Sequence, residues 1–276
     1  MLQSATEPAG IQTAPDEAHS GVLTGLSDLD ELTGPLPPGR LSVLGGRTSA
    51  GSTAFMVTTA LHSALASTGT AFVTTQSTDE QLRRNLLAAL ASVNLDRRHT
   101  VNAGRRARVR AAGRTLEKTE LYTWNPIQRG TGKPTAETPE EICDRLRELH
   151  QRSPLGLVLV DNLSLLAYRE PTDGQAVHEL ARLARELDIP VLLAAHLRFD
   201  HAMVESDLPT TADFADPHVL RAAYAVLLLH NPDRYGKAPE RAGLVDVIAA
   251  HGWNPAGTAT VRFEPEYHRL VDLPNA

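Results

Sequence analysis

Residues 40–53 read RLSVLGGRTSAGST, an apolar run that passes directly into a glycine-rich turn. The run 40–45 is typical of a buried strand, and apolar residues at helical spacing follow from Thr53 to about Ser67. Glycines let backbone amides wrap around a phosphate, and the N-terminus of the following helix adds its dipole. The order of strand, turn and helix therefore favours a phosphate-binding loop, with an ordinary tight turn as the alternative.

The turn matches the spacing G-x4-G-x-[ST] of a phosphate loop. Thr53 stands where a hydroxyl would bind Mg²⁺, but Ser52 stands where that motif has a lysine. A hydroxyl cannot supply the point charge that lysine gives to the β- and γ-phosphates of a nucleotide. The candidate nucleotide-binding residues are Gly46, Arg47, Thr48, Ser49, Ala50, Gly51, Ser52 and Thr53.

Apolar runs of strand length recur along the rest of the chain. They are TAFVTT (70–75), LGLVLV (155–160), IPVLLAA (189–195), YAVLLLH (224–230), LVDVIAA (244–250) and TATVRFE (258–264). Helical patterns over Asp79–Ser92, Pro139–Gln151 and 175–188 separate the earlier runs, whereas no helical pattern separates the last three. We predict an α/β fold with a mainly parallel sheet, helices on both faces and an antiparallel C-terminal edge. Residues 125–137 are expected to form a loop.

Composition narrows the class of protein. The single cysteine, Cys143, excludes a disulfide scaffold and any multi-cysteine zinc or iron–sulfur site. No run approaches the length of a membrane span, and the N-terminus lacks the features of a secretory signal, so we expect a soluble, cytoplasmic protein without a membrane partner. Residues 1–20 are predicted to be a disordered acidic tail, and residues 21–276 a single domain.

Several segments together resemble the motor domain of DnaB-type replicative helicases. They are TGLSDLDELTGPLPPGRLSVLGG (24–46), LGLVLVDNLSLL (155–166), IPVLLAAHLR (189–198), DFADPHVLRAAYAVLLLH (213–230) and WNPAGTATVRFEP (253–265). The resemblance covers about residues 22–272 and places Asp161 at the position of the Mg²⁺-binding acid. It implies a RecA-like P-loop NTPase core that assembles into hexameric rings around single-stranded DNA and hydrolyses ATP between subunits. The chain is expected to be the motor module alone, without the family's N-terminal primase-interacting domain.

The departures from the family pattern fall at the positions that bind and hydrolyse ATP in the family. The family's P-loop lysine corresponds to Ser52, its catalytic glutamate to Gln76 and its sensor glutamine to His196. A carboxylate can accept the proton of an attacking water, whereas a neutral amide cannot. The lysine and arginine that would reach a neighbouring subunit's γ-phosphate are missing from residues 251–254. Arg47 could compensate for one loss, and an alignment offset near 251–254 would restore neither Ser52 nor Gln76.

Thr53 and Asp161 keep the Mg²⁺-binding half of the site, so ATP or ADP with Mg²⁺ is the expected cofactor. The economical interpretation is a degenerate ATPase: a non-catalytic, oligomeric factor that binds nucleotide, DNA or protein and is linked to DNA replication or its regulation. One alternative is an active ATP-dependent DNA helicase or translocase with an atypical site. Another is a circadian-clock or repair ATPase of the same superfamily. The expected partners are further copies in a hexameric ring, single-stranded DNA or replication proteins.

Two further segments carry hypotheses about partners. An arginine-rich segment, 97–114, contains no acid, and Arg105, Arg106, Arg108 and Arg110 are its candidate DNA-binding residues. The solvated face of a helix and a subunit contact remain alternatives, because no aromatic residue offers a stacking platform. Leucines recur at every third position from Leu23 to Leu32, which predicts that the segment Gly21–Pro38 mediates oligomerisation. The alternative is that these leucines pack on their own domain.

Overall fold

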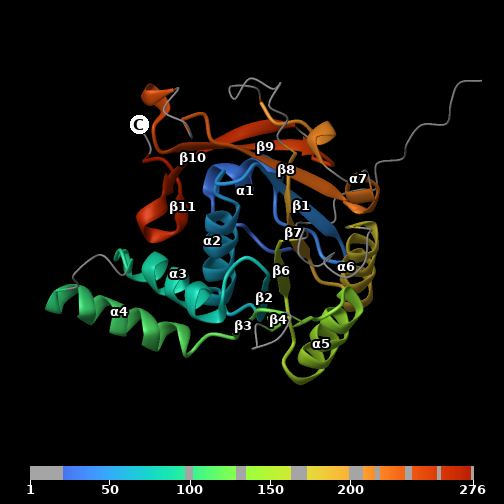
Figure 1. Cartoon of the computed structure of the whole chain (residues 1–276), viewed down its shortest axis with the longest axis horizontal. Helices are drawn as coiled ribbons and strands as arrows, with labels where there is room; N and C mark the ends of the chain where they lie inside the picture. The colour runs from blue at the N-terminus through green and yellow to red at the C-terminus, as the bar shows by residue number, and fades with distance from the viewer. Residues whose placement is uncertain are drawn as a thin grey trace, which may run out of the picture.

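The computed structural model describes residues 21–96, 102–128, 135–162, 173–198, 208–214, 218–233, 238–253 and 256–274. The expected acidic tail, residues 1–20, lies outside the described residues. Among the described residues, nine strands form one sheet in the order β11-β10-β9-β8-β1-β7-β6-β2-β3 (Figure 1). These strands are β1 (Leu41–Gly46), β2 (Thr70–Thr74), β3 (Leu121–Trp124), β6 (Leu157–Asp161), β7 (Val191–His196), β8 (Ala225–His230), β9 (Leu244–His251), β10 (Gly257–Glu264) and β11 (Arg269–Val271).

The sheet is parallel from β3 to β8 and antiparallel from β8 to β11. The helices are α1 (Ser27–Thr33), α2 (Ser52–Leu65), α3 (Asp79–Ala91), α4 (Ala103–Leu116), α5 (Pro139–Arg152), α6 (Asp173–Leu187) and α7 (His218–Ala222). Parallel neighbours need a crossover, which the helices supply, whereas antiparallel neighbours can follow one another directly. The predicted fold class is confirmed, including the antiparallel C-terminal edge.

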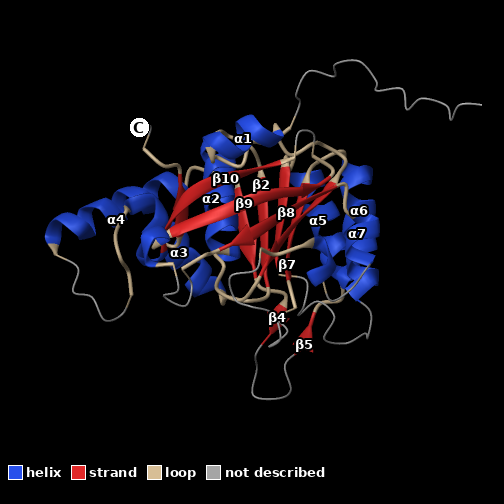
Figure 2. Ribbon diagram, turned by 90° about the horizontal axis from the view of Figure 1, so that it is seen from above, coloured by secondary structure: helices blue, strands red, loops and turns tan. Residues whose placement is uncertain are grey.

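Alternation along the central strands builds two cores. On β6, Leu157 and Leu159 point into one core, and Val158 and Val160 point into the other. The first core is covered by α1, α2 and α3, and the second by α5, α6 and α7, so the sheet lies between two helical layers (Figure 2). This two-sided burial explains why the parallel strands read as continuous apolar runs in the sequence.

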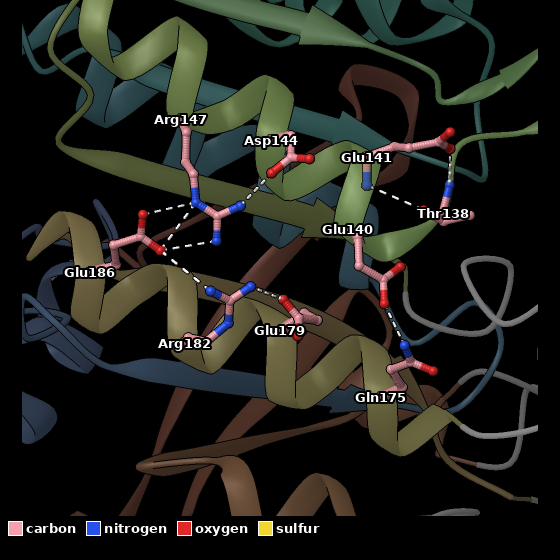
Figure 3. A network of polar contacts seen from close by, with 9 residues as sticks. All are labelled: Thr138, Glu140, Glu141, Asp144, Arg147, Gln175, Glu179, Arg182 and Glu186. Atoms are coloured by element: carbon pink, nitrogen blue, oxygen red, sulfur yellow. Dashed lines mark hydrogen bonds and ion pairs between the residues drawn. The ribbon is translucent and has the colours of Figure 1, made fainter.

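Polar contacts brace α5 against α6 over the second core (Figure 3). The predicted start of α5 is confirmed, since Thr138 Oγ1 accepts a hydrogen bond from the Glu141 backbone N–H (3.2 Å) and Glu141 Oε2 accepts one from Thr138 N–H (2.7 Å). Further along α5, Arg147 Nε donates to Glu186 of α6 (2.9 Å). The two helices are therefore joined by charged groups of opposite sign on their solvent side.

The expectation of a loop over residues 125–137 is wrong in part. Two short strands, β4 (Ile127–Gln128) and β5 (Thr135–Ala136), pair antiparallel within it. The turn into β4 is fixed by Asn125, whose Oδ1 accepts the Ile127 backbone N–H (2.7 Å). Strands of two residues have no detectable apolar period, so periodicity could not reveal this pair.

The leucines near the N-terminus pack mainly on their own domain. Leu26 and Leu29 have no exposed surface, and Leu32 packs against the same core. A Cβ at Gly257, the first residue of β10, would lie 2.7 Å from Leu32 Cδ1, which shows how closely α1 approaches the sheet. Only Leu23, 44% exposed, faces solvent. The prediction that these leucines form an oligomer face is therefore corrected for Leu26, Leu29 and Leu32.

We predict that Leu29→Ala lowers the free energy of unfolding by about 2–5 kcal/mol, because it opens a cavity under α1 in a closed core. The matched control Leu23→Ala removes the same atoms from a half-exposed side chain and should change stability by less than about 0.5 kcal/mol. Urea denaturation of both variants measures the difference. Equal losses in the two variants would contradict the packing of α1 described above.

Candidate functional site

The carboxyl ends of four parallel strands meet at one edge of the sheet. Gly46 at the end of β1 pairs with His196 at the end of β7, and Thr74 of β2 pairs with Asp161 at the end of β6. Ligands bind beyond this edge in open α/β sheets. The register therefore brings the phosphate-loop candidate, Asp161 and His196 together, although long segments of sequence separate them.

The loop between β1 and α2 has the compact shape of a phosphate cradle. Gly51 has a φ of 109°, in the left-handed region that favours glycine, and Ser49 has a φ of 63°. A Cβ at Gly46 would lie only 2.4 Å from Ser52 Oγ, so the loop folds back tightly on the strand that precedes it. Helix α2 begins at Ser52 and presents its N-terminus to this loop. The geometry fits an anion held by backbone amides and a helix dipole.

Thr53 and Asp161, the two candidate Mg²⁺ ligands, are in direct contact. Thr53 Oγ1 donates a hydrogen bond to Asp161 Oδ2 at 2.8 Å. Asp161 is only 2% exposed, and this burial raises the pKa of its carboxyl group, while the Thr53 hydrogen bond and the charge of His196 act in the opposite direction. A hydroxyl and a carboxylate are oxygen ligands of the kind that Mg²⁺ takes. These two residues fit an Mg²⁺ ion that accompanies a bound nucleotide.

Gln76 and His196 meet at the same edge. Gln76 Nε2 lies 3.2 Å from His196 Nε2, so the two side chains are within hydrogen-bonding distance. The residues predicted to replace a catalytic glutamate and a sensor glutamine are thus direct neighbours. An amide beside an imidazole leaves the Gln76 position without a carboxylate that could take a proton from water.

Arg47, the one arginine of this loop, forms an ion pair with Asp213. Its guanidinium lies 3.6 Å from the carboxylate of Asp213, and both residues are buried, at 8% and 5% exposed. Asp213 ends a short 3₁₀ helix, Thr211–Asp213, where Oδ2 also accepts the Thr210 backbone N–H (2.9 Å). A buried ion pair is held firmly, because separating it would leave a desolvated charge. The idea that Arg47 compensates for Ser52 is therefore disfavoured.

Sequence reasoning missed two residues that shape this edge. Asp213 is one, and no local pattern pairs it with Arg47. The other is Thr75, which is fully buried and whose Oγ1 donates to the Asn162 carbonyl (3.0 Å) and accepts the Asn162 N–H (3.2 Å). This contact ties the end of β2 to the residue after Asp161 and so fixes the acid in place.

The remaining candidates lie elsewhere. His251 pairs with Val226 near the amino end of β8, and Trp253 Nε1 donates to the Val226 carbonyl (3.2 Å). Because β8 runs parallel to β1, these residues lie at the opposite edge of the sheet from the phosphate loop. Arg105, Arg106, Arg108 and Arg110 are exposed on α4 and do not join the site. Residues 215–217 and 254–255 lie outside the described residues.

A family model of the DnaB-like helicase C-terminal domain matches residues 21–272. The chain belongs to this family. Among curated relatives, it is 29% identical over 269 residues to the replicative DNA helicase DnaB of Leifsonia xyli subsp. xyli, and the alignment covers 94% of this chain. It is 26% identical over 270 residues to the replicative DNA helicase DnaC of Bacillus subtilis, with 92% of this chain covered. The chain spans 57% of the length of each of these two relatives.

Solved structures support the fold of this DnaB-family domain. A solved ATPase domain superposes with a TM-score of 0.81 at 22% identity, covering 94% of each chain. A DnaB-like replicative helicase, described with its interactions with primase, gives a TM-score of 0.82 at 22% identity over 95% of this chain and 66% of its own. The RadB recombinase gives a TM-score of 0.58 at 19% identity, and the superposition covers 92% of this chain and 100% of the recombinase. The RecA-like architecture is thereby confirmed. Within the described part of the chain, no helix is both long and apolar enough to cross a bilayer.

We predict that Asp161→Asn raises the free energy of unfolding at pH 7. Burial raises the pKa of Asp161 in the folded domain, so ionisation of this carboxyl group opposes folding above the ordinary aspartate pKa of about 3.9. The gain from Asn should shrink as the pH falls toward that value, because aspartate is then protonated in both the folded and the unfolded chain. Urea denaturation of both proteins at neutral pH and near pH 4 measures it.

Asp28→Asn serves as the control, since it makes the same chemical change at a residue that is exposed on α1. A loss of stability in Asp161→Asn that is the same at both pH values would contradict the unfavourable burial of this carboxylate.

Proposed function

We propose that this DnaB-family domain binds ATP or ADP with Mg²⁺ and does not turn the nucleotide over, so that it acts as an oligomeric binding factor in DNA replication or its regulation. The observation that carries this proposal is the pairing of Thr53 with Asp161 in a site that has Ser52 and Gln76 at the lysine and glutamate positions. The metal-binding half of the site is present, and the half that would activate water is replaced.

Retention of nucleotide binding is supported by the shape of the loop. The backbone from Gly46 to Gly51 and the N-terminus of α2 would hold the phosphates. Thr53 and Asp161 would hold Mg²⁺, which supplies charge compensation for the phosphate oxygens when it is bound. Without a lysine, affinity for the terminal phosphates should be lower than in an intact P-loop.

Loss of turnover is supported by the neighbours of the reacting position. Gln76 lies against His196, and neither residue is a carboxylate. Arg47 is engaged by Asp213. Neither a lysine nor an arginine stands at positions 251–253. These residues lie at the end of the sheet opposite the phosphate loop, so a cation there could act only on the site of a second copy.

The second candidate function is an active ATP-dependent DNA helicase or translocase with an atypical site. The observation that favours it is that Thr53 and Asp161 lie in hydrogen-bonding contact, as a working metal site would require. Family membership and the relatives, which are replicative DNA helicases, also support this candidate.

The proposed partners follow from the same relatives. We propose further copies of the chain, up to a hexameric ring, together with single-stranded DNA or replication proteins. One similar structure is described with its interactions with primase, which makes a replication protein a natural partner to test. We also propose a cytoplasmic location, the domain boundaries 1–20 and 21–276, and no membrane partner.

We predict that the wild-type chain binds ADP in the presence of Mg²⁺ but shows no ATP hydrolysis above background, with or without single-stranded DNA. A positioned general base contributes about 10²–10⁴ in rate, which Gln76 should forfeit. An arginine finger from a neighbouring subunit contributes about 10³–10⁵. Loss of the base alone would lower a typical turnover of about 10 s⁻¹ to about 0.1 s⁻¹ or less, and loss of the finger as well would lower it further. Isothermal titration with ADP and a phosphate-release assay make the two measurements.

Three variants sharpen this experiment. Thr53→Ala should abolish the Mg²⁺ dependence of ADP binding, while the control Thr115→Ala, which alters an exposed residue of α4 outside the phosphate loop, should keep it. Ser52→Lys should tighten binding without restoring turnover, and Ser52→Lys with Gln76→Glu should recover at most a trace. DNA-stimulated phosphate release by the wild type at an ordinary enzymatic rate would establish the second candidate instead.

We also predict that assembly, where it occurs, uses the exposed part of the segment Gly21–Pro38. Deletion of this segment would remove Leu26 and Leu29 from the core, so it cannot test assembly cleanly. Leu23→Asp changes a residue that is 44% exposed and should reduce the sedimenting species to a smaller oligomer or a monomer. Leu65→Asp, at 46% exposed on α2, is the control. An unchanged oligomeric state in Leu23→Asp would rule this surface out.

A further inference from the structure

Helix α4 carries five arginines and no acidic residue along Ala103–Leu116. All five side chains are exposed: Arg105, Arg106, Arg108, Arg110 and Arg114. Solvated protein surfaces ordinarily intersperse charges of both signs. A helix with charge of one sign over its whole exposed surface therefore needs a reason.

The charges work against the helix that carries them. Arg106, Arg110 and Arg114 follow one another at intervals of four residues, and like charges at this spacing destabilise a helix by about 0.2–0.5 kcal/mol per pair. Arg105 and Arg106 lie in the first turn, where the helix dipole disfavours cations. Packing involves few residues of this helix: Ala112 is buried, and Val109 and Leu116 are partly buried.

The arginines of α5 and α6 behave differently. Arg147 contacts Glu186 and Asp144, and Arg182 contacts Glu179, as the network in Figure 3 shows. By contrast, no ion pair joins any of the five α4 arginines to another residue in the described part of the chain. The α4 arginines therefore do not brace the fold.

The position of α4 leaves its arginines open to a large partner. In both ribbon views α4 lies at one extremity of the molecule, beyond α3 (Figures 1 and 2). Its inner side, with Gly113 and Leu116, lines a hollow of about 490 Å³ shared with α3 and β3. The acids Asp79, Glu80 and Glu117 also line that hollow.

We propose that α4 binds the phosphate backbone of a nucleic acid through the row Arg106, Arg110 and Arg114, with Arg105 and Arg108 flanking it. Residues four apart on a helix are separated by about 6 Å along its axis, which forms a straight line of guanidinium groups. Guanidinium groups bind phosphate oxygens in a bidentate manner. Since this contact reads charge and not bases, the binding is independent of sequence.

A protein partner is disfavoured by the rest of the exposed face. Between the arginines, the exposed residues of α4 are Ala107 and Ala111. Protein interfaces depend on buried aromatic or apolar anchors, which this face lacks. Small side chains do allow a helix to approach a phosphate backbone closely. The absence of an aromatic residue on α4 also removes the stacking platform that single strands use, which favours a duplex.

This proposal is independent of the nucleotide site. The arginines lie on α4, which packs on α3, and none of them contacts the edge formed by Gly46, Thr53 and Asp161. Failure of nucleotide binding would therefore leave the α4 proposal standing, and the reverse also holds.

The test uses the full chain without nucleotide. Fluorescence anisotropy with a labelled duplex of about 30 base pairs, and with a single strand of the same length, gives the affinity between about 50 and 200 mM salt. The triple variant Arg106→Gln, Arg110→Gln, Arg114→Gln should bind about tenfold more weakly or worse at the lower salt. Its slope of log affinity against log salt should be smaller by up to about 2.7, because each lost phosphate contact removes about 0.9.

A control triple variant changes the net charge equally: Arg145→Gln, Arg152→Gln and Arg182→Gln. Each of these arginines contacts a carboxylate on its own surface, so the control should bind nucleic acid as the wild type does. Thermal melts should show the α4 variant at least as stable as the wild type, since like-charge repulsion is relieved.

The two arms of the experiment separate the kinds of nucleic acid. A loss of affinity in the α4 variant but not in the control variant supports the proposal. The nucleic acid that shows this loss, duplex or single strand, is then the ligand. Equal losses in both triple variants, or no binding by the wild type at the lower salt, would overturn it. Binding of polyglutamate in place of both nucleic acids would overturn it in favour of an acidic protein partner.

Discussion

The hydrogen bond from Thr53 Oγ1 to the buried carboxylate of Asp161 joins the two halves of this molecule's functional edge. Thr53 belongs to α2, which follows β1, and Asp161 ends β6, two places away in the sheet. The carboxylate of Asp161 is only 2% exposed and therefore needs hydrogen-bond donors around it. The neighbouring segments must end where they can supply those donors. Thr75, bonded to Asn162 on both its donor and acceptor sides, holds the same strand end from β2. The geometry of the phosphate loop depends on these contacts.

Around that contact, the chemistry of the site divides in two. On the metal side, a hydroxyl and a carboxylate remain in a geometry suited to Mg²⁺. On the side where water would be activated, the side chains of Gln76 and His196 lie within hydrogen-bonding distance of each other. The one arginine in the loop, Arg47, is held by Asp213. An arrangement of this kind favours holding a ligand over transforming it, which is why we propose a nucleotide-binding factor within the DnaB-like helicase family.

Charge is used in two opposite ways on the surface. Between α5 and α6, arginines and carboxylates alternate and join the two helices over the second core (Figure 3). On α4, arginines accumulate without acids and the helix is held mainly by α3. The first pattern is explained by the fold itself. The fold does not explain the second pattern, and for this reason we propose a nucleic acid as the partner of α4.

The local features of this protein can be predicted from its amino-acid sequence. Apolar runs located the central strands, and the helical pattern over Pro139–Gln151 located α5, because burial leaves a record in neighbouring residues. The lack of a lysine at position 52 is likewise a property of the sequence alone. The contact between Gln76 and His196, 120 residues apart, and the ion pair between Arg47 and Asp213 result from the folding of distant segments onto one another. Strand order and register set which groups face each other, and these carry no local signature.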